Sequence, residues 1–200
     1  MAHSLAARLP KRRLATAMAI ASIAVALARD GEAESVQVPL ELQAELLVKL
    51  APYDRHFAER AQERVHVLVV VNADDAESRH SAELLSSALA QLDRIGGLPH
   101  DEAVLSFQGA LALAAACRER RVSIVYVSSG LSGQVAGIRG ALDGIDVLSA
   151  SVVPEYVPQG IVLGFEASSG HPKLTLNLAQ ARKQNVAIAA SVLKLMKVYE

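Results

Sequence analysis

The 200-residue sequence has little cysteine, no tryptophan and no excess of basic over acidic residues. Cys117 is its single cysteine, which excludes an internal disulfide and a zinc module built from several cysteines. The 20 basic residues face 21 acidic ones, so we expect no nucleic-acid partner, because such binders usually carry a basic excess. With 52% hydrophobic residues, the chain is not expected to be disordered, and its length predicts about one domain.

The first 33 residues have the pattern of a secretory signal peptide. Four basic residues precede an uncharged apolar run at 14–28, which is too short for a comfortable membrane span. Small residues place the cleavage site after Ala28 or Ala33, and the incomplete twin-arginine context favours Sec-type export to the periplasm. Residues 1–33 contain five of the basic and two of the acidic residues, so the domain at 34–200 has a net charge near −4. This balance favours solubility and gives no attraction to anionic lipid.

The mature chain alternates strand and helix patterns. Val65–Val71 is an almost unbroken β-branched run, and Val122–Val127 is a second strand of the buried type. A helix with apolar residues at helical spacing follows each strand, and Asp74 is expected to cap the first of these helices, which would bury Leu84 and Leu85. Further elements are expected as helices at 40–51, 109–120 and 178–197, with a pause near Asn185, and as strands at 103–107 and 145–150.

The C-terminal third predicts a different strand arrangement. Ile161–Phe165 and Lys173–Asn177 flank the turn Ser168–Gly170, and this pattern is typical of an antiparallel hairpin. Together the elements predict an α/β fold: a single three-layer domain with a mostly parallel sheet, a C-terminal antiparallel hairpin and flanking helices.

A glycine- and serine-rich loop follows the strand Val122–Val127. Its candidate ligand-binding residues are Ser128, Ser129, Gly130, Ser132 and Gly133. A loop at this position could present backbone N–H groups to an anion, but neither the nucleophile elbow nor the phosphate-loop motif is complete. The loop is therefore either an ordinary β-α turn or a small-molecule site.

Catalytic and metal-binding patterns are not found in the sequence. The histidines lack the spacing of metal ligands, and Cys117 lies in an alanine-rich helix pattern that favours a core position. We therefore expect no catalytic residue, no metal and no cofactor.

Two pairs of residues are candidates for binding a protein partner. Tyr156 and Val157 lie on a loop stiffened by two prolines, which could present an exposed aromatic side chain. The alternative is that Tyr156 folds back over the edge of the sheet. Tyr53 and Phe57 are four residues apart on one face of the first helix, where they could serve a homodimer, another partner or the core.

Four motifs follow one another in the C-terminal part of the chain: a Gly-led apolar strand, a glycine turn, a strand ending in Asn-Leu and a final helix containing Ser and leucines. They are Gly160–Phe165, Gly170, Lys173–Leu178 with Ala181-Arg182, and Ser191–Leu195. In this order the motifs resemble the C-terminal signature of YfiR-type periplasmic proteins. The first helix, with Lys49, Tyr53 and Phe57, is similar to the opening helix of that family. The chain departs from the family in lacking its paired cysteines and the Trp-Pro after the first helix.

The resemblance implies a non-enzymatic periplasmic regulator. Its expected partner is the periplasmic part of an inner-membrane diguanylate cyclase or sensor kinase, and an OmpA-like outer-membrane lipoprotein is expected to sequester it. The alternative that remains open is a periplasmic small-molecule binding protein that uses the Ser128–Gly133 loop, since open α/β sheets bind ligands beyond the carboxyl ends of their strands.

Overall fold

The computed structural model describes residues 37–168 and 171–200. The predicted signal peptide and the turn residues Ser169 and Gly170 lie outside the described residues. The described residues belong to the unit that spans Val36–Glu200.

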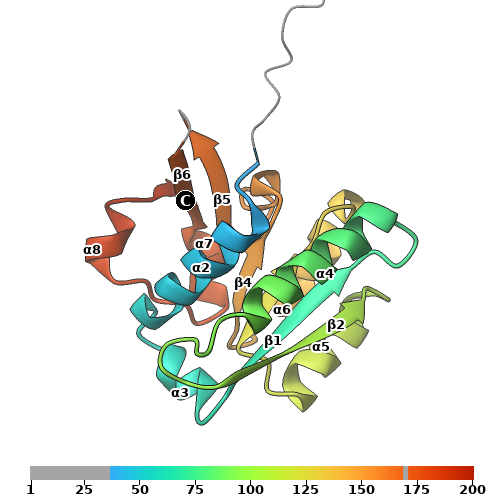
Figure 1. The fold of residues 1–200 in the computed structure, drawn as a ribbon, viewed down its shortest axis with the longest axis horizontal. Helices are drawn as coiled ribbons and strands as arrows, with labels where there is room; N and C mark the ends of the chain where they lie inside the picture. Colours follow the sequence, from blue (N-terminus) through green and yellow to red (C-terminus); the bar gives the residue numbers. More distant parts are fainter. Residues whose placement is uncertain (1–36, 169–170) are drawn as a thin grey trace, which may run out of the picture. The chain divides into compact units, whose positions relative to one another are not determined.

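A seven-stranded sheet forms the middle layer, with the strand order β2-β1-β3-β4-β5-β6-β7 (Figure 1). Its strands are β1 (Val65–Val71), β2 (His100–Ser106), β3 (Ile124–Val127), β4 (Leu148–Ser151), β5 (Leu163–Ser168), β6 (His171–Asn177) and β7 (Lys197–Tyr199). Strands β1 to β5 are parallel, β6 runs antiparallel to β5, and β7 runs parallel to β6. The mostly parallel sheet and the antiparallel hairpin are therefore confirmed.

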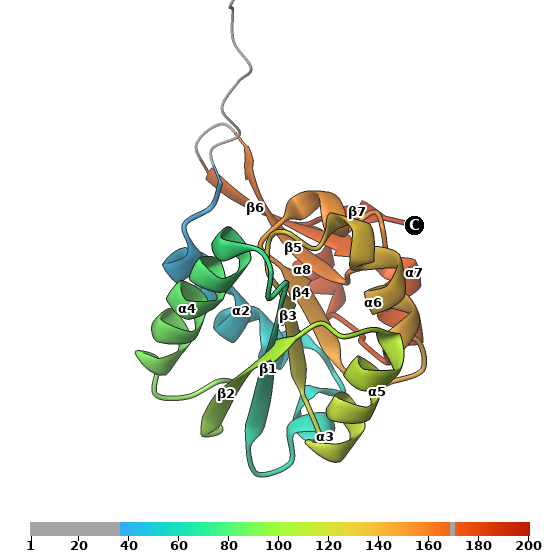
Figure 2. The same ribbon diagram turned by 90° about the vertical axis from the view of Figure 1, so that its right-hand side faces the viewer.

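Helices cover both faces of the sheet, which confirms the α/β class. They are α2 (Leu40–Leu50), α3 (Phe57–Ala61), α4 (Ala76–Ala90), α5 (Ala110–Glu119), α6 (Val135–Leu142), α7 (Leu178–Lys183) and α8 (Ala190–Leu193), with 3-10 turns η1 (Ala51–Tyr53), η2 (Ser132–Gln134) and η3 (Pro154–Tyr156). Figure 2 shows α4 and α5 on opposite sides of the sheet. Alternate residues of β1 enter the two cores: Val67 and Val69 pack with α2 and α4, whereas Leu68 and Val70 pack with α5 and α6. This burial on both faces explains why β1 reads as a continuous apolar run.

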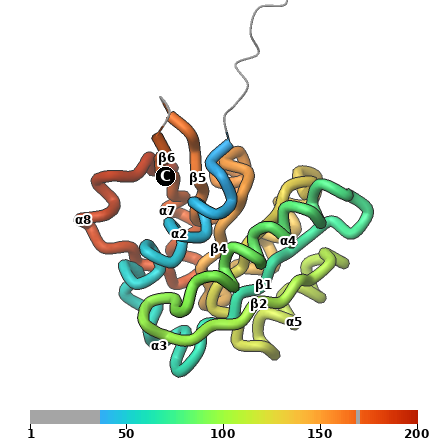
Figure 3. The backbone as a smooth tube through the Cα atoms, in the orientation of Figure 1, coloured from blue at the N-terminus to red at the C-terminus, as the bar shows by residue number. Residues whose placement is uncertain are grey.

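A buried polar pair fixes α2 on the sheet. Gln43 is fully buried on α2, where its side-chain amide donates to the Val38 carbonyl at 2.7 Å and its oxygen accepts a hydrogen bond from the Tyr126 hydroxyl. Because a buried hydroxyl without a partner is costly, this pairing lets Tyr126 lie in the core of β3. Figure 3 traces α2 and the C-terminal segment side by side. The Ala189 N–H donates to the Tyr53 carbonyl and so joins this segment to the turn η1 that follows α2.

The helix after β1 differs from its prediction at two positions. Asp75, not Asp74, caps α4, because its carboxylate accepts hydrogen bonds from the N–H groups of Glu77 and Ser78. Leu84 is exposed, whereas the buried face of α4 includes Leu85 and Leu89. The cap therefore lies one residue further along the chain than the capping pattern predicts.

The chain end is the largest departure from the predicted elements. The pause near Asn185 is confirmed, since Asn185 has a left-handed φ of 53° after α7. However, the single helix expected up to Lys197 is wrong: α8 spans only Ala190–Leu193, and β7 follows. Pairing of β7 with the outer edge of β6 is a tertiary interaction that local periodicity does not report. Likewise, β4 begins at Leu148, three residues later than expected.

Candidate partner-binding groove

The serine side chains of the Ser128–Gly133 loop are bonded within the molecule. The Ser128 hydroxyl donates to the Val70 carbonyl at 2.9 Å and lies 2.6 Å from the Ser78 hydroxyl of α4. The Ser129 hydroxyl lies 3.1 Å from that of Ser81. Hydrogen bonds from the loop therefore hold α4 against the carboxyl end of β3.

The backbone of the loop also makes its contacts within the molecule. Gly130 has a φ of +73°, and a Cβ there would overlap the Asp75 carboxylate that caps α4. The Gly130 carbonyl accepts a hydrogen bond from the Asn72 side chain at 3.0 Å, and the Leu131 N–H donates to the Tyr156 hydroxyl at 3.0 Å. Ser132 and Gly133 alone among the six loop residues are exposed. This geometry is that of a closed β-α turn.

Tyr156 and Val157 lie inside the molecule. Tyr156 is only 3% exposed, and Val157 is fully buried. The Tyr156 hydroxyl accepts the Leu131 N–H, and burial raises the pKa of this hydroxyl. The expectation of an exposed aromatic on the proline loop is therefore wrong, and the alternative, in which Tyr156 folds back, is observed. The physical reason is that the folded-back Tyr156 hydroxyl gives the buried Leu131 N–H a hydrogen-bond acceptor.

Tyr53 and Phe57 do not share a helix face. Helix α2 ends at Leu50, the turn η1 follows, and α3 begins at Phe57. This break buries Phe57 in the core and leaves Tyr53 50% exposed. Of the two aromatic candidates in this region, Tyr53 is thus the side chain that a partner could reach.

Tyr53 lines an apolar groove of about 210 Å³ between α2, β6 and the C-terminal segment. We call this hollow the α2 groove, and its lining residues are Leu46, Lys49, Leu50, Tyr53, Leu174, Val192 and Leu195. Leu195 is 75% exposed, so the groove wall keeps a large apolar side chain in water. A smaller hollow of about 80 Å³ lies at the amino end of α2, between Pro39, Leu42 and Pro172. Contiguous exposed apolar surface of this kind is typical of binding sites.

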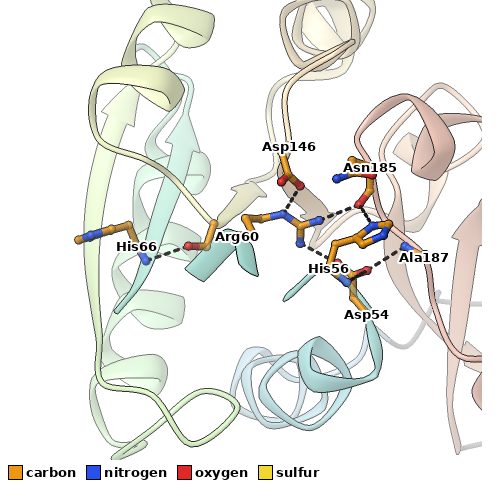
Figure 4. Close-up of polar contacts among 8 residues, drawn as sticks. Asp54, His56, Arg60, His66, Asp146, Asn185 and Ala187 are labelled. Atoms are coloured by element: carbon orange, nitrogen blue, oxygen red, sulfur yellow. Dashed lines mark hydrogen bonds and ion pairs between the residues drawn. The ribbon is translucent and has the colours of Figure 1, made fainter. Parts of the chain in front are cut away.

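A buried ionic cluster holds the C-terminal wall of the groove in place (Figure 4). The Arg60 guanidinium, almost fully buried, lies 2.6 Å from the Asp54 carboxylate and 2.7 Å from that of Asp146. It also donates to the Asn185 carbonyl at 3.0 Å. Asp54 in turn accepts the Ala187 N–H at 2.8 Å. These bonds attach residues 185–187 to the segment after α2. They therefore fix the C-terminal wall of the groove relative to the wall that α2 forms.

Lys49 is the charged residue among those that line the α2 groove. Its ammonium group lies 3.2 Å from the Glu45 carboxylate. Lys197 bonds Glu166 at 3.1 Å, and hydrogen bonding to Tyr199 and Glu166 raises the pKa of its ammonium group. Both ammonium groups are thus paired with a carboxylate of the same chain.

The described residues offer no obvious metal site or reactive thiol. Within residues 37–168 and 171–200, no three His, Cys, Asp or Glu side chains are placed to hold a metal ion together. Cys117 is buried, and burial raises the pKa of its thiol to about 11, so it is a poor nucleophile at neutral pH. Among the described helices, none is long and apolar enough to cross a bilayer.

The structure is an α/β domain with an apolar groove on its surface. The profile of the YfiR/HmsC-like family matches residues 40–197, and the chain belongs to this family. This confirms the resemblance seen in the sequence. No curated protein sequence matches the chain.

Three solved structures share the fold. A conserved domain protein from Vibrio cholerae O1 biovar El Tor is 16% identical, with 81% of this chain and 60% of that chain covered and a TM-score of 0.57. An ABC domain from Streptococcus pneumonia in complex with L-Trp is 13% identical, with 80% and 60% covered and a TM-score of 0.58. A ligand-free, open substrate binding protein with adhesive properties from Clostridium difficile is 12% identical, with 82% and 60% covered and a TM-score of 0.54. The chain spans 60% of the length of each, and at these identities the likeness extends to the fold alone.

Tyr53 was a candidate from the sequence, whereas Leu174, Val192 and Leu195 were not expected to join it. Leu174 belongs to the predicted hairpin, and Val192 and Leu195 fall within the stretch expected to be one helix. Only the tertiary position of the chain end, however, brings these side chains beside Tyr53.

Proposed function

We propose that the chain is a periplasmic, non-enzymatic regulator that binds the periplasmic part of an inner-membrane signalling protein, either a diguanylate cyclase or a sensor kinase. The observation that carries this proposal is the α2 groove, which leaves Tyr53 and Leu195 exposed on a folded domain. Membership of the YfiR/HmsC-like family supports it. Export by the predicted signal peptide would place the groove in the same compartment as such a partner.

The groove suits a short segment of apolar side chains. Burying one exposed leucine-sized side chain contributes about 1.5–3 kcal/mol, so two or three anchors give a useful gross gain before ordering costs are subtracted. The lining favours no charge on the segment, because its charged residue, Lys49, is already paired with Glu45. The partner segment is therefore expected to be apolar.

We propose that release of the partner uses the same groove. An OmpA-like outer-membrane lipoprotein would relieve regulation if it occupied the α2 groove and excluded the inner-membrane protein. Because the two binding events would use one surface, each should weaken the other by simple competition. The small-molecule alternative would place a ligand at the Ser128–Gly133 loop instead.

Co-purification from solubilised membranes tests the proposal. The exported chain, the variant Leu195→Asp and the matched variant Leu84→Asp are each used to capture partners, which are identified by mass spectrometry. We expect the parent chain and Leu84→Asp to recover an inner-membrane protein with a cytoplasmic cyclase or kinase domain, and Leu195→Asp to lose it. Equal recovery by all three chains would remove the groove from the interface, and recovery of no membrane protein would favour the small-molecule role.

A further inference from the structure

Two adjoining hollows lie beside the amino ends of β1 and β3. Their volumes are about 490 Å³ and about 450 Å³, which is the size of small-molecule sites. Arg60, Gln62 and Arg121 line both hollows, so the two form one site, which we call the arginine pocket. It shares no lining residue with the α2 groove. Apart from Ala61, every residue that lines the second hollow is polar or charged, so the pocket suits a polar ligand.

Four arginines line the arginine pocket, and two of them have no carboxylate partner among the described residues. These two are Arg118 and Arg121, near the end of α5, which are exposed and belong to none of the ion pairs in the described part of the chain. Arg60 is instead paired with Asp54 and Asp146, as Figure 4 shows. A ligand can therefore contact the guanidinium groups of Arg118 and Arg121 without breaking an ion pair.

The backbone around this pocket adopts conformations that are uncommon for residues other than glycine. Among the described residues, three non-glycine residues have a positive φ: Gln62 at 54°, Arg121 at 50° and Asn185 at 53°. Gln62 and Arg121 line the pocket, and the Asn185 carbonyl accepts a hydrogen bond from Arg60, which lines it as well. Such conformations cost free energy and are concentrated at functional sites. Their grouping around one pocket points to a function for its side chains.

Arg121 occupies a position at which glycine is the usual residue. The Val122 N–H donates to the Cys117 carbonyl at 2.9 Å, and the Arg121 N–H donates to the Arg118 carbonyl at 3.3 Å. This is the Schellman arrangement, in which the left-handed residue after the helix is usually glycine because glycine has no Cβ. Arginine at this position gives up local stability, and in return it supplies a guanidinium group to the pocket. That group makes only a long hydrogen bond, of 3.4 Å, to the Gln62 side chain.

We propose that the arginine pocket binds a small soluble molecule that carries one phosphate or carboxylate group together with hydroxyl groups. Arg118 and Arg121 hold the oxyanion, because a guanidinium group can donate to two oxygens of a phosphate or carboxylate at once. Glu59 and Glu63 also line the pocket, where they accept hydrogen bonds from the hydroxyl groups and disfavour ligands with several anionic groups. This site depends neither on the α2 groove nor on a membrane partner.

Isothermal titration calorimetry with glycerol phosphate and with glycerate tests the pocket, and neutral glycerol is the control ligand. We expect the parent chain to bind at least one of the two anions saturably and not to bind glycerol. Arg118→Ala and Arg121→Ala should each weaken this binding about tenfold or more, because hydrogen bonds between charged groups are the strong ones. Arg120→Ala is the matched control, since Arg120 is exposed between the two but does not line the pocket, and its affinity should stay within about twofold of the parent value.

Three results would overturn the proposal. The first is a parent chain that binds neither anion saturably up to about 10 mM. The second is a loss of affinity in Arg120→Ala as large as in Arg118→Ala and Arg121→Ala, which would indicate general charge attraction. The third is binding to phosphatidylglycerol vesicles without binding to either soluble anion, which would make a lipid headgroup the source of the phosphate.

Arg121→Gly separates ligand binding from the stability of the fold. Glycine adopts the left-handed conformation freely, so this variant should unfold at a urea concentration no lower than Arg121→Ala does. It should nevertheless bind the anion as weakly as Arg121→Ala, because both lack the guanidinium group. Binding by Arg121→Gly with the affinity of the parent chain would also overturn the proposal.

Discussion

The Ser128–Gly133 loop and the α2 groove lie on the same domain, and each differs from what its sequence predicts, in opposite directions. The loop has the composition of a ligand-binding loop, yet Ser128, Ser129 and the Gly130 carbonyl all have partners inside the molecule. The groove follows a helix whose pattern predicts core packing, yet Tyr53 and Leu195 beside it stay exposed. Composition indicates which bonds a segment can form. Tertiary neighbours decide whether those bonds are already made.

The largest effect is expected where the groove wall is anchored. Asp54→Ala removes a fully buried carboxylate from Arg60 and from the Ala187 N–H, and breaking a buried ion pair costs about 3–5 kcal/mol of unfolding free energy. Urea unfolding measures this loss. Asp146→Ala should cost clearly less, because the Asp146 side chain is partly exposed. Equal losses for the two variants would contradict the anchoring role of Asp54.

Glycine substitutions in the loop separate its closed part from its open part. Gly130→Ala introduces a Cβ at a left-handed φ and against the Asp75 carboxylate, and we expect a loss of about 2 kcal/mol. Gly133→Ala is the control, since no atom lies within 4 Å of its Cβ position, and its effect should stay within about 0.5 kcal/mol. Stability is measured by thermal and urea unfolding. Equal stability of the two variants would contradict the closed conformation of the loop.

The Tyr156 hydroxyl gives a smaller test of the same closure. Tyr156→Phe leaves the buried Leu131 N–H without its acceptor, which should lower the unfolding free energy by about 1–2 kcal/mol. Tyr53→Phe removes an exposed hydroxyl for which we expect almost no change in stability. If the two variants unfolded at the same urea concentration, the hydrogen bond to Leu131 would not stabilise the loop.

The smallest effect on stability is expected in the groove itself. Leu195→Asp changes a side chain that is three quarters exposed, so its unfolding free energy should stay within about 0.5 kcal/mol of the parent value. The same variant should lose its membrane partner, as proposed above. A large loss of stability would mean that Leu195 belongs to the core and is not a free part of the groove wall.

Much of the fold could be predicted from local patterns. Strand β1 has the predicted bounds because both of its faces are buried. The predicted start of the helix at Leu178 is observed as well, and the Asn177 side chain caps it by accepting the Gln180 N–H. The antiparallel pairing of β5 and β6 follows from the alternation around a turn. These elements are specified by residues that are close together in the sequence.

The groove could not be predicted because it depends on contacts between distant segments. The Arg60 side chain joins Asp54, Asp146 and the Asn185 carbonyl, which lie up to 125 residues from it along the chain. Strand β7 forms only where β6 offers its outer edge, and this strand replaces the end of the predicted helix. Tyr53 was a candidate from its spacing, but its separation from Phe57 depends on the turn η1.

Site-specific photo-crosslinking in the exporting cell shows which surface meets the partner. A photoreactive amino acid is placed at Tyr53, at Leu195 and, as the control in the loop, at the exposed Ser132. We expect positions 53 and 195 to capture an inner-membrane protein with a cytoplasmic cyclase or kinase domain, and position 132 not to capture it. Capture of that protein from position 132 but from neither groove position would exclude the α2 groove as the binding surface.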